Sequence, residues 1–176
     1  MIRTALLGLF LAASSVSALA QHHHAPAASP YAGFEMREVK ALSDPQVADL
    51  KAGRGMGYAL SAELNGYPGP SHVLELGGQL LLTEAQRRRI QDLFDAMKAE
   101  TIPIGERLIA QETDLDRLFS RRTATTANLT AATAAIGATQ TALRAAHLKY
   151  HLATVEILTT EQVRRYGELR GYFDVR

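Results

Sequence analysis

The sequence contains no cysteine and no tryptophan, and its charges nearly cancel, with 19 Lys and Arg against 18 Asp and Glu. Without cysteine the chain has no disulfide, no thiol nucleophile and no ligand for a thiolate zinc or iron–sulfur site. The balanced charge argues against nucleic acid as the main partner, because a phosphate-binding surface needs an excess of Lys and Arg. Hydrolase motifs such as Gly-x-Ser-x-Gly and HExxH are also missing, so we expect no enzyme activity.

Residues 1–20 have the pattern of a cleaved signal peptide. Arg3 precedes an apolar stretch over residues 6–13, and small residues at 18–20 stand where a signal peptidase would cut. The apolar stretch is too short to span a membrane, and no later segment approaches the roughly 20 apolar residues that a span requires. We therefore expect an exported protein without a membrane span, whose mature chain carries no net charge once Arg3 is removed.

Residues 21–34 are rich in histidine, proline and alanine, a composition that favours a disordered tail. His22, His23 and His24 would lie at the new N-terminus, where they could bind zinc, copper or nickel weakly. The alternative is a tail that only improves solubility.

Residues 35–70 are expected to form short helices that end in a turn rich in glycine and proline. Ser43 and Gln46 have the spacing of a capping box, and the three glycines over 53–57 would end the helix that this box begins. One or two further helical turns over 58–65 would stop at the Asn-Gly-Tyr-Pro-Gly-Pro segment that follows.

Residues 71–176 predict a long antiparallel hairpin of two helices, followed by a short helix. Apolar residues recur three and four positions apart over 84–119, and Pro103 does not disturb their phase, so we expect one kinked helix rather than two. The same spacing resumes over 129–157, and no segment alternates with a period of two, so the fold class is all-α. Two thin helices enclose no interior, and a homodimer would cover their exposed apolar faces.

Two of these helices begin with a leucine, a threonine and a glutamine at the same spacing. The first copy is Leu82, Thr83 and Gln86, and the second is Leu158, Thr159 and Gln162. Each threonine can cap the free N–H groups of its helix while the glutamine reaches back to the cap, which contributes about 1 kcal/mol per helix. We expect these residues to act mainly through stability.

Two such LTxxQ boxes, a long hairpin apart in an exported chain without cysteine, resemble the Spy/CpxP family of periplasmic stress proteins, which includes zinc-resistance-associated relatives. The similarity covers residues 71–172. It implies an all-helical, cradle-shaped homodimer in the periplasm that holds unfolding proteins without ATP, with zinc or other transition metals bound in some relatives. The chain departs from the family in charge, because the chaperone members have a basic concave face and this mature chain is neutral.

Apolar and basic residues outside the helix seams are candidates for a surface that binds unfolded clients. They are Arg87, Arg88, Leu93, Ile109, Leu148 and Leu152. Apolar segments of a client would pack on the aliphatic side chains, and its negative charges would be attracted by the arginines. The alternative is that these residues are buried against the final helix and a second subunit.

His147 and His151 stand four residues apart, which places both imidazoles on one face of the second long helix. A tight zinc site needs three or four ligands, and the neighbouring turns of this helix offer no acid in register. Either a second subunit completes the site or both residues are ordinary histidines of the helix seam. No cofactor is required, and a transition metal such as zinc is the candidate ligand.

These observations predict a periplasmic, ATP-independent holdase for unfolded envelope proteins, or an envelope-stress adaptor. A second hypothesis is a sensor or resistance protein for zinc, copper or nickel that uses the histidines. A third is a module that docks on a sensor kinase and has no general client activity.

Overall fold

The computed structural model describes residues 29–172, and the chain divides into two compact units, Met1–Ala32 and Gly33–Arg176. In the first unit, the described residues form a turn in which Ala32 N donates to Ser29 O at 2.9 Å. The predicted signal peptide, over residues 1–20, and the histidines at 22–24 lie outside the described residues. All further description concerns the second unit.

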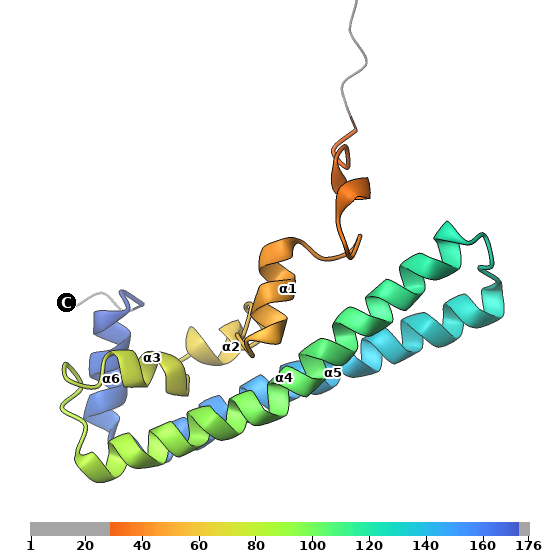
Figure 1. The fold of residues 1–176 in the computed structure, drawn as a ribbon. Helices are drawn as coiled ribbons and strands as arrows, with labels where there is room; N and C mark the ends of the chain where they lie inside the picture. Colours follow the sequence, from red (N-terminus) through yellow and green to blue (C-terminus); the bar gives the residue numbers. More distant parts are fainter. Residues whose placement is uncertain (1–28, 173–176) are drawn as a thin grey trace, which may run out of the picture. The chain divides into compact units, whose positions relative to one another are not determined.

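Every regular element in the described part of the second unit is a helix. In chain order these are η1 (Phe34–Met36), α1 (Asp44–Lys51), α2 (Leu60–Glu63), α3 (Pro70–Glu75), α4 (Glu84–Ser120), α5 (Thr126–Val155) and α6 (Thr160–Leu169). The long helices α4 and α5 lie side by side as an antiparallel hairpin, and α6 lies beside α3 at the base of that hairpin (Figure 1). The all-α prediction is confirmed, with short helices flanking a long hairpin.

The hairpin consists of one helix of 37 residues and one of 30 residues. At 1.5 Å per residue, these helices are about 55 and 45 Å long. Pro103 lies inside α4, as the phase of the apolar residues predicted, while the bend expected there stays a prediction. α5 begins at Thr126, three residues before the apolar spacing resumes at Leu129, because Thr125 caps it with Asn128 in a fourth capping box that the sequence analysis did not identify.

Both LTxxQ boxes form as predicted, and their glutamines also bind each other. Thr83 Oγ1 accepts from Gln86 N at 3.2 Å, and Thr159 Oγ1 accepts from Gln162 N at 3.1 Å. Gln86 Nε2 donates to Gln162 Oε1 at 2.8 Å, while Gln162 Nε2 donates to Gln86 Oε1 at 3.1 Å. This reciprocal amide pair joins the starts of α4 and α6.

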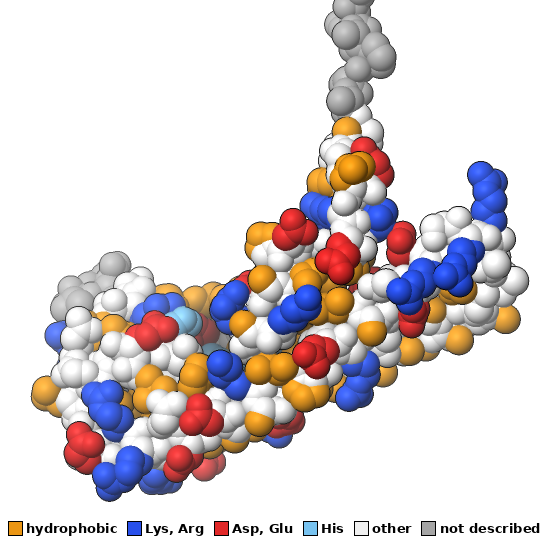
Figure 2. Space-filling view, viewed as in Figure 1, with side chains coloured by type: hydrophobic (Ala, Val, Ile, Leu, Met, Phe, Trp, Pro, Cys, Tyr) orange, Lys and Arg blue, Asp and Glu red, His pale blue; other side chains and the backbone are white. Residues whose placement is uncertain are grey.

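Two hydrophobic clusters hold the short helices on the hairpin. The first consists of Leu50, Leu108, Ile136 and Leu143, and it joins α1 to both long helices. The second consists of Val73, Leu80, Ile90 and Tyr166, and it joins α3, α4 and α6. Figure 2 shows hydrophobic side chains gathered along the line where α1 meets the hairpin.

α1 approaches α4 most closely at Gly105. A Cβ atom on this glycine would lie 2.7 Å from the carbonyl oxygen of Leu50. The backbone of α1 therefore occupies the space that any larger residue at this position of α4 would need.

None of the helices in residues 29–172 is long and apolar enough to cross a membrane.

Candidate functional site

A cavity of about 550 Å³ lies between the short helices and the hairpin. Every element from α1 to α5 contributes to its wall, and the residues with metal-binding or titratable groups include Met56, Glu63, His72, Met97, His147 and His151. Figure 2 shows a hollow beside a histidine side chain on this face. Both histidines that the sequence analysis selected on α5 therefore line one cavity.

The glycine-rich loop at 53–57 forms one wall of this cavity. Gly53 has a φ of 66°, and a Cβ there would lie 2.9 Å from Thr101 Oγ1 of α4. A Cβ on Gly55 would lie 3.7 Å from His147 Nδ1 of α5. The sequence analysis expected these glycines only to end α1, whereas Gly53 also lets the loop pack closely on α4.

His147 is buried, with 2% of its surface exposed, and its Nε2 has no hydrogen-bond partner among the described residues. Its ring lies parallel to that of Tyr58, with 6.3 Å between the ring centroids. Burial lowers the pKa of the imidazole, and the neighbouring His151 lowers it further. His147 is therefore neutral at pH 7 and available as a nitrogen donor to a ligand.

His151 is oriented by the backbone of the segment between α2 and α3. Its Nδ1 lies 2.6 Å from the carbonyl oxygen of Tyr67, which can only accept, so Nδ1 carries the proton. Nε2 is then the nitrogen with the lone pair, and Gly69 packs against this edge of the ring. A carbonyl that fixes the tautomer of a histidine is a common support for a metal ligand.

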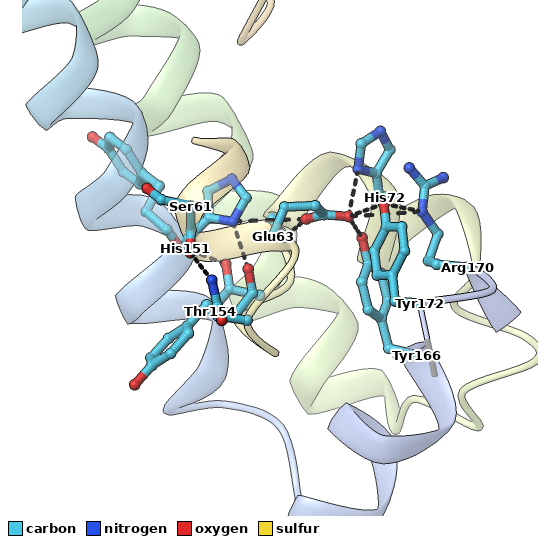
Figure 3. A network of polar contacts seen from close by, with 12 residues as sticks. Ser61, Glu63, His72, His151, Thr154, Tyr166, Arg170 and Tyr172 are labelled. Atoms are coloured by element: carbon cyan, nitrogen blue, oxygen red, sulfur yellow. Dashed lines mark hydrogen bonds and ion pairs between the residues drawn. The ribbon is translucent and has the colours of Figure 1, made fainter. Parts of the chain in front are cut away.

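Glu63 of α2 is the centre of a polar cluster at one end of the cavity, which we call the Glu63 cluster. Its members are Glu63, His72, Tyr166, Arg170 and Tyr172 (Figure 3). The carboxylate accepts hydrogen bonds from the Tyr166 hydroxyl and, at 3.0 Å, from the Tyr172 hydroxyl. His72 Nδ1 lies 3.6 Å from the same carboxylate, and Arg170 Nε lies 3.7 Å away.

The Glu63 carboxylate stays ionised although only 6% of the residue is exposed. Burial alone would raise its pKa, but the interaction with His72 and the hydrogen bonds from the two tyrosines outweigh burial and lower the pKa to about 2. Burial and the hydrogen bond to Glu63 in turn raise the pKa of the Tyr166 hydroxyl. The cluster therefore ties α2 and α3 to α6 through one buried charge.

The sequence analysis selected neither Glu63 nor His72 as a site residue. The structure also places Glu63 Oε2 3.8 Å from His151 Nδ1. No acid on α5 itself lies in register with His147 and His151, but α2 places the Glu63 carboxylate close to His151. Glu63 and Tyr166 stand 103 positions apart, so the sequence contains no local signal for this contact.

A family model described as heavy-metal resistance matches residues 59–165. The chain belongs to the heavy-metal resistance family. This family is part of the Spy/CpxP-like helical group, which supports the predicted resemblance at that broader level. No curated protein and no solved structure matches the chain.

The described residues do not form a complete site for an ion that needs three nitrogen or carboxylate ligands. Among residues 29–172, no three His, Asp or Glu side chains are grouped so that they could hold a metal ion. For a heavy-metal resistance protein, His147 and His151 therefore fit as two donors of a site, and any further donors must be of another kind or come from elsewhere. The histidines at 22–24 lie outside the described residues.

The residues predicted to bind clients do not form one exposed surface. Arg88 is exposed and Leu152 is 55% exposed, while Arg87, Leu93 and Leu148 are half-buried. Arg87 packs its guanidinium on Gly77, and Ile109 packs against the first hydrophobic cluster. Ile109 therefore packs against residues of α1, α4 and α5, and not against the final helix that the alternative interpretation named.

Proposed function

We propose that this protein binds transition-metal ions outside the cytoplasm and contributes to heavy-metal resistance by buffering or sensing them, without a catalytic step. The observation that carries the proposal is the buried His147, whose Nε2 lacks a hydrogen-bond partner and whose side chain lines the same cavity as His151. A buried polar group without a partner costs free energy, and a bound ion would supply the missing interaction. The heavy-metal resistance family supports the same proposal.

A route from metal binding to a change in conformation follows from the Glu63 cluster. His72 and His151 both line the cavity, and each has a ring nitrogen within 4 Å of the Glu63 carboxylate. An ion bound to His72 Nδ1 would compete with this carboxylate for the imidazole, whereas Nδ1 of His151 is occupied by the carbonyl oxygen of Tyr67. Because the carboxylate also holds Tyr166, such competition would weaken the attachment of α6, as a sensor requires.

Titration calorimetry with zinc, nickel and copper tests the proposal. The His147→Phe variant keeps a ring against Tyr58 and removes the nitrogen donors, while a matched variant replaces the histidines at 22–24 with alanine. We expect binding to weaken strongly in His147→Phe and to persist in the tail variant, with the helical circular dichroism of both unchanged. Loss of binding in the tail variant alone, or no binding by the unmodified protein, would overturn the proposed cavity site.

Client binding is the second candidate function, and exposed apolar residues on α2 and α5 favour it. Leu60 is 54% exposed, Leu64 follows α2 at 51%, and Leu152 of α5 is 55% exposed. α2 and α5 contact each other. This candidate includes the predicted homodimer and an adaptor role toward a sensor kinase.

Light scattering by a denaturing model protein, with and without zinc, tests client binding. If the protein suppresses the scattering and the Leu152→Ser variant does not, client binding is supported. Equal scattering in the presence and absence of the protein would exclude it.

A further inference from the structure

Two methionine thioethers share the cavity with His147. Met97 comes from α4 and Met56 comes from the glycine-rich loop at 53–57. Met97 is only 6% exposed, yet it belongs to neither hydrophobic cluster of the described residues. Met97 therefore lines the cavity from a position that is buried within the fold.

The backbone at Met56 is in a conformation that L-residues rarely adopt. Met56 has a φ of 44°, and it stands between Gly55 and Gly57 in a loop whose other special positions are glycines. Left-handed backbone at a residue other than glycine costs free energy and is often found at binding sites. Met56 lines the cavity, and it also packs against the first hydrophobic cluster.

The donors present favour one class of metal ion. Thioether sulfur binds soft ions such as Cu(I) far better than Zn(II) or Mg(II), and Cu(I) is satisfied by two or three ligands. Three grouped His, Asp or Glu side chains, which a divalent ion would use, are absent from the part of the chain that the structure describes. The neutral His147 adds a borderline nitrogen donor to the two sulfur atoms.

Charged side chains of both signs line the cavity. Arg54 is paired with Asp49 at 2.5 Å, Lys98 is the second cation of the wall, and Glu63 is occupied by the Glu63 cluster. Glu75 is exposed and accepts a hydrogen bond from the Ser71 hydroxyl at 3.3 Å. The sulfur donors, rather than the charge of the wall, therefore favour one class of ion.

We propose that this cavity binds a soft monovalent ion, Cu(I), through the thioethers of Met97 and Met56 and the imidazole of His147. This inference rests on the proposed function and specifies the class of metal. The competing explanation is that both methionines only fill space, as flexible side chains often do.

Cu(I) binding is measured anaerobically by competition with a chromophoric chelator, in protein whose histidines at 22–24 are replaced by alanine in every arm. Met97→Leu and Met56→Leu keep the side-chain volume and remove the sulfur. Met36→Leu is the matched control, because Met36 is 83% exposed and does not line the cavity. X-ray absorption at the copper edge reports directly on sulfur neighbours.

We expect Met97→Leu to weaken Cu(I) binding by more than about tenfold, since even the loss of outer-shell partners costs that much. Met36→Leu should leave affinity unchanged, and the Cu–S scattering should fall in Met97→Leu. Unchanged affinity in both Met97→Leu and Met56→Leu, or copper surrounded only by nitrogen and oxygen, would overturn the inference. If zinc still binds through His147 in that case, the proposed function stands and only the class of metal is wrong. If the protein binds no metal, the proposed function and the Cu(I) inference both fail.

Discussion

The close approach of α1 to α4 predicts that two glycine substitutions in the long helices have opposite effects. Replacement of glycine by alanine inside a helix normally stabilises it by about 1 kcal/mol. At Gly105 the added methyl group would lie 2.7 Å from the Leu50 carbonyl oxygen, and a backbone atom cannot rotate away as a side chain can. Relief of such overpacking costs about 1–3 kcal/mol. Because this contact is with rigid backbone, the cost lies in the upper part of that range, about 2–3 kcal/mol, and subtraction of the gain of about 1 kcal/mol leaves Gly105→Ala destabilised by about 1–2 kcal/mol.

Gly137 in the middle of α5 is the matched control, because a Cβ atom there meets nothing within 4 Å. Gly137→Ala should therefore stabilise the protein by about 1 kcal/mol. Thermal unfolding followed by circular dichroism at one protein concentration should show Tm falling by about 3–6 °C in Gly105→Ala and rising by about 3 °C in Gly137→Ala. If both variants raise Tm equally, the described contact between α1 and α4 is wrong.

Three further predictions concern the polar contacts. The pKa of Glu63 is about 2 in the folded protein and 4.5 without its partners. The ionised carboxylate therefore stabilises the fold by about 3 kcal/mol above pH 4.5, and this contribution is lost as the pH falls toward 2. Urea unfolding between pH 6 and 2 should show this loss in the unmodified protein and not in Glu63→Gln; equal pH dependence would contradict the described cluster. Thr83→Ala should lower the free energy of unfolding by about 1 kcal/mol through loss of the cap, and an unchanged stability would refute the capping role. In a double-mutant cycle, Gln86→Ala and Gln162→Ala should be less than additive by about 1 kcal/mol, and full additivity would mean that the amide pair does not form in solution.

The helices could be predicted from the sequence because their signals are local. The Thr83 cap and its Gln86 partner lie within one turn, and the apolar residues of α4 keep their phase across Pro103. The cap of α5 was missed because Asn128 takes the place that glutamine has in the other boxes. Local sequence signals therefore predict where the long helices lie. The exact residue at which each helix begins depends on recognising its capping residues.

The candidate site could be predicted only in part, because it depends on contacts between distant segments. The spacing of His147 and His151 places them on one face of a helix, but burial of His147 depends on the loop at 53–57, whose glycines predicted only a helix end. Glu63 and Tyr166 are 103 residues apart, and neither residue type signals the other. A single sequence contains no period or motif for such a pairing.

The amide pair at the base of the hairpin has a consequence for the order of folding. It joins positions 76 residues apart, whereas the turn at the opposite end connects α4 and α5 directly. Closure of a short loop costs less entropy than closure of a long one, so contacts near the turn form early and the base closes last. Interactions that form after the transition state slow unfolding without accelerating folding. The LTxxQ boxes would therefore determine how long the folded protein persists rather than how quickly it forms.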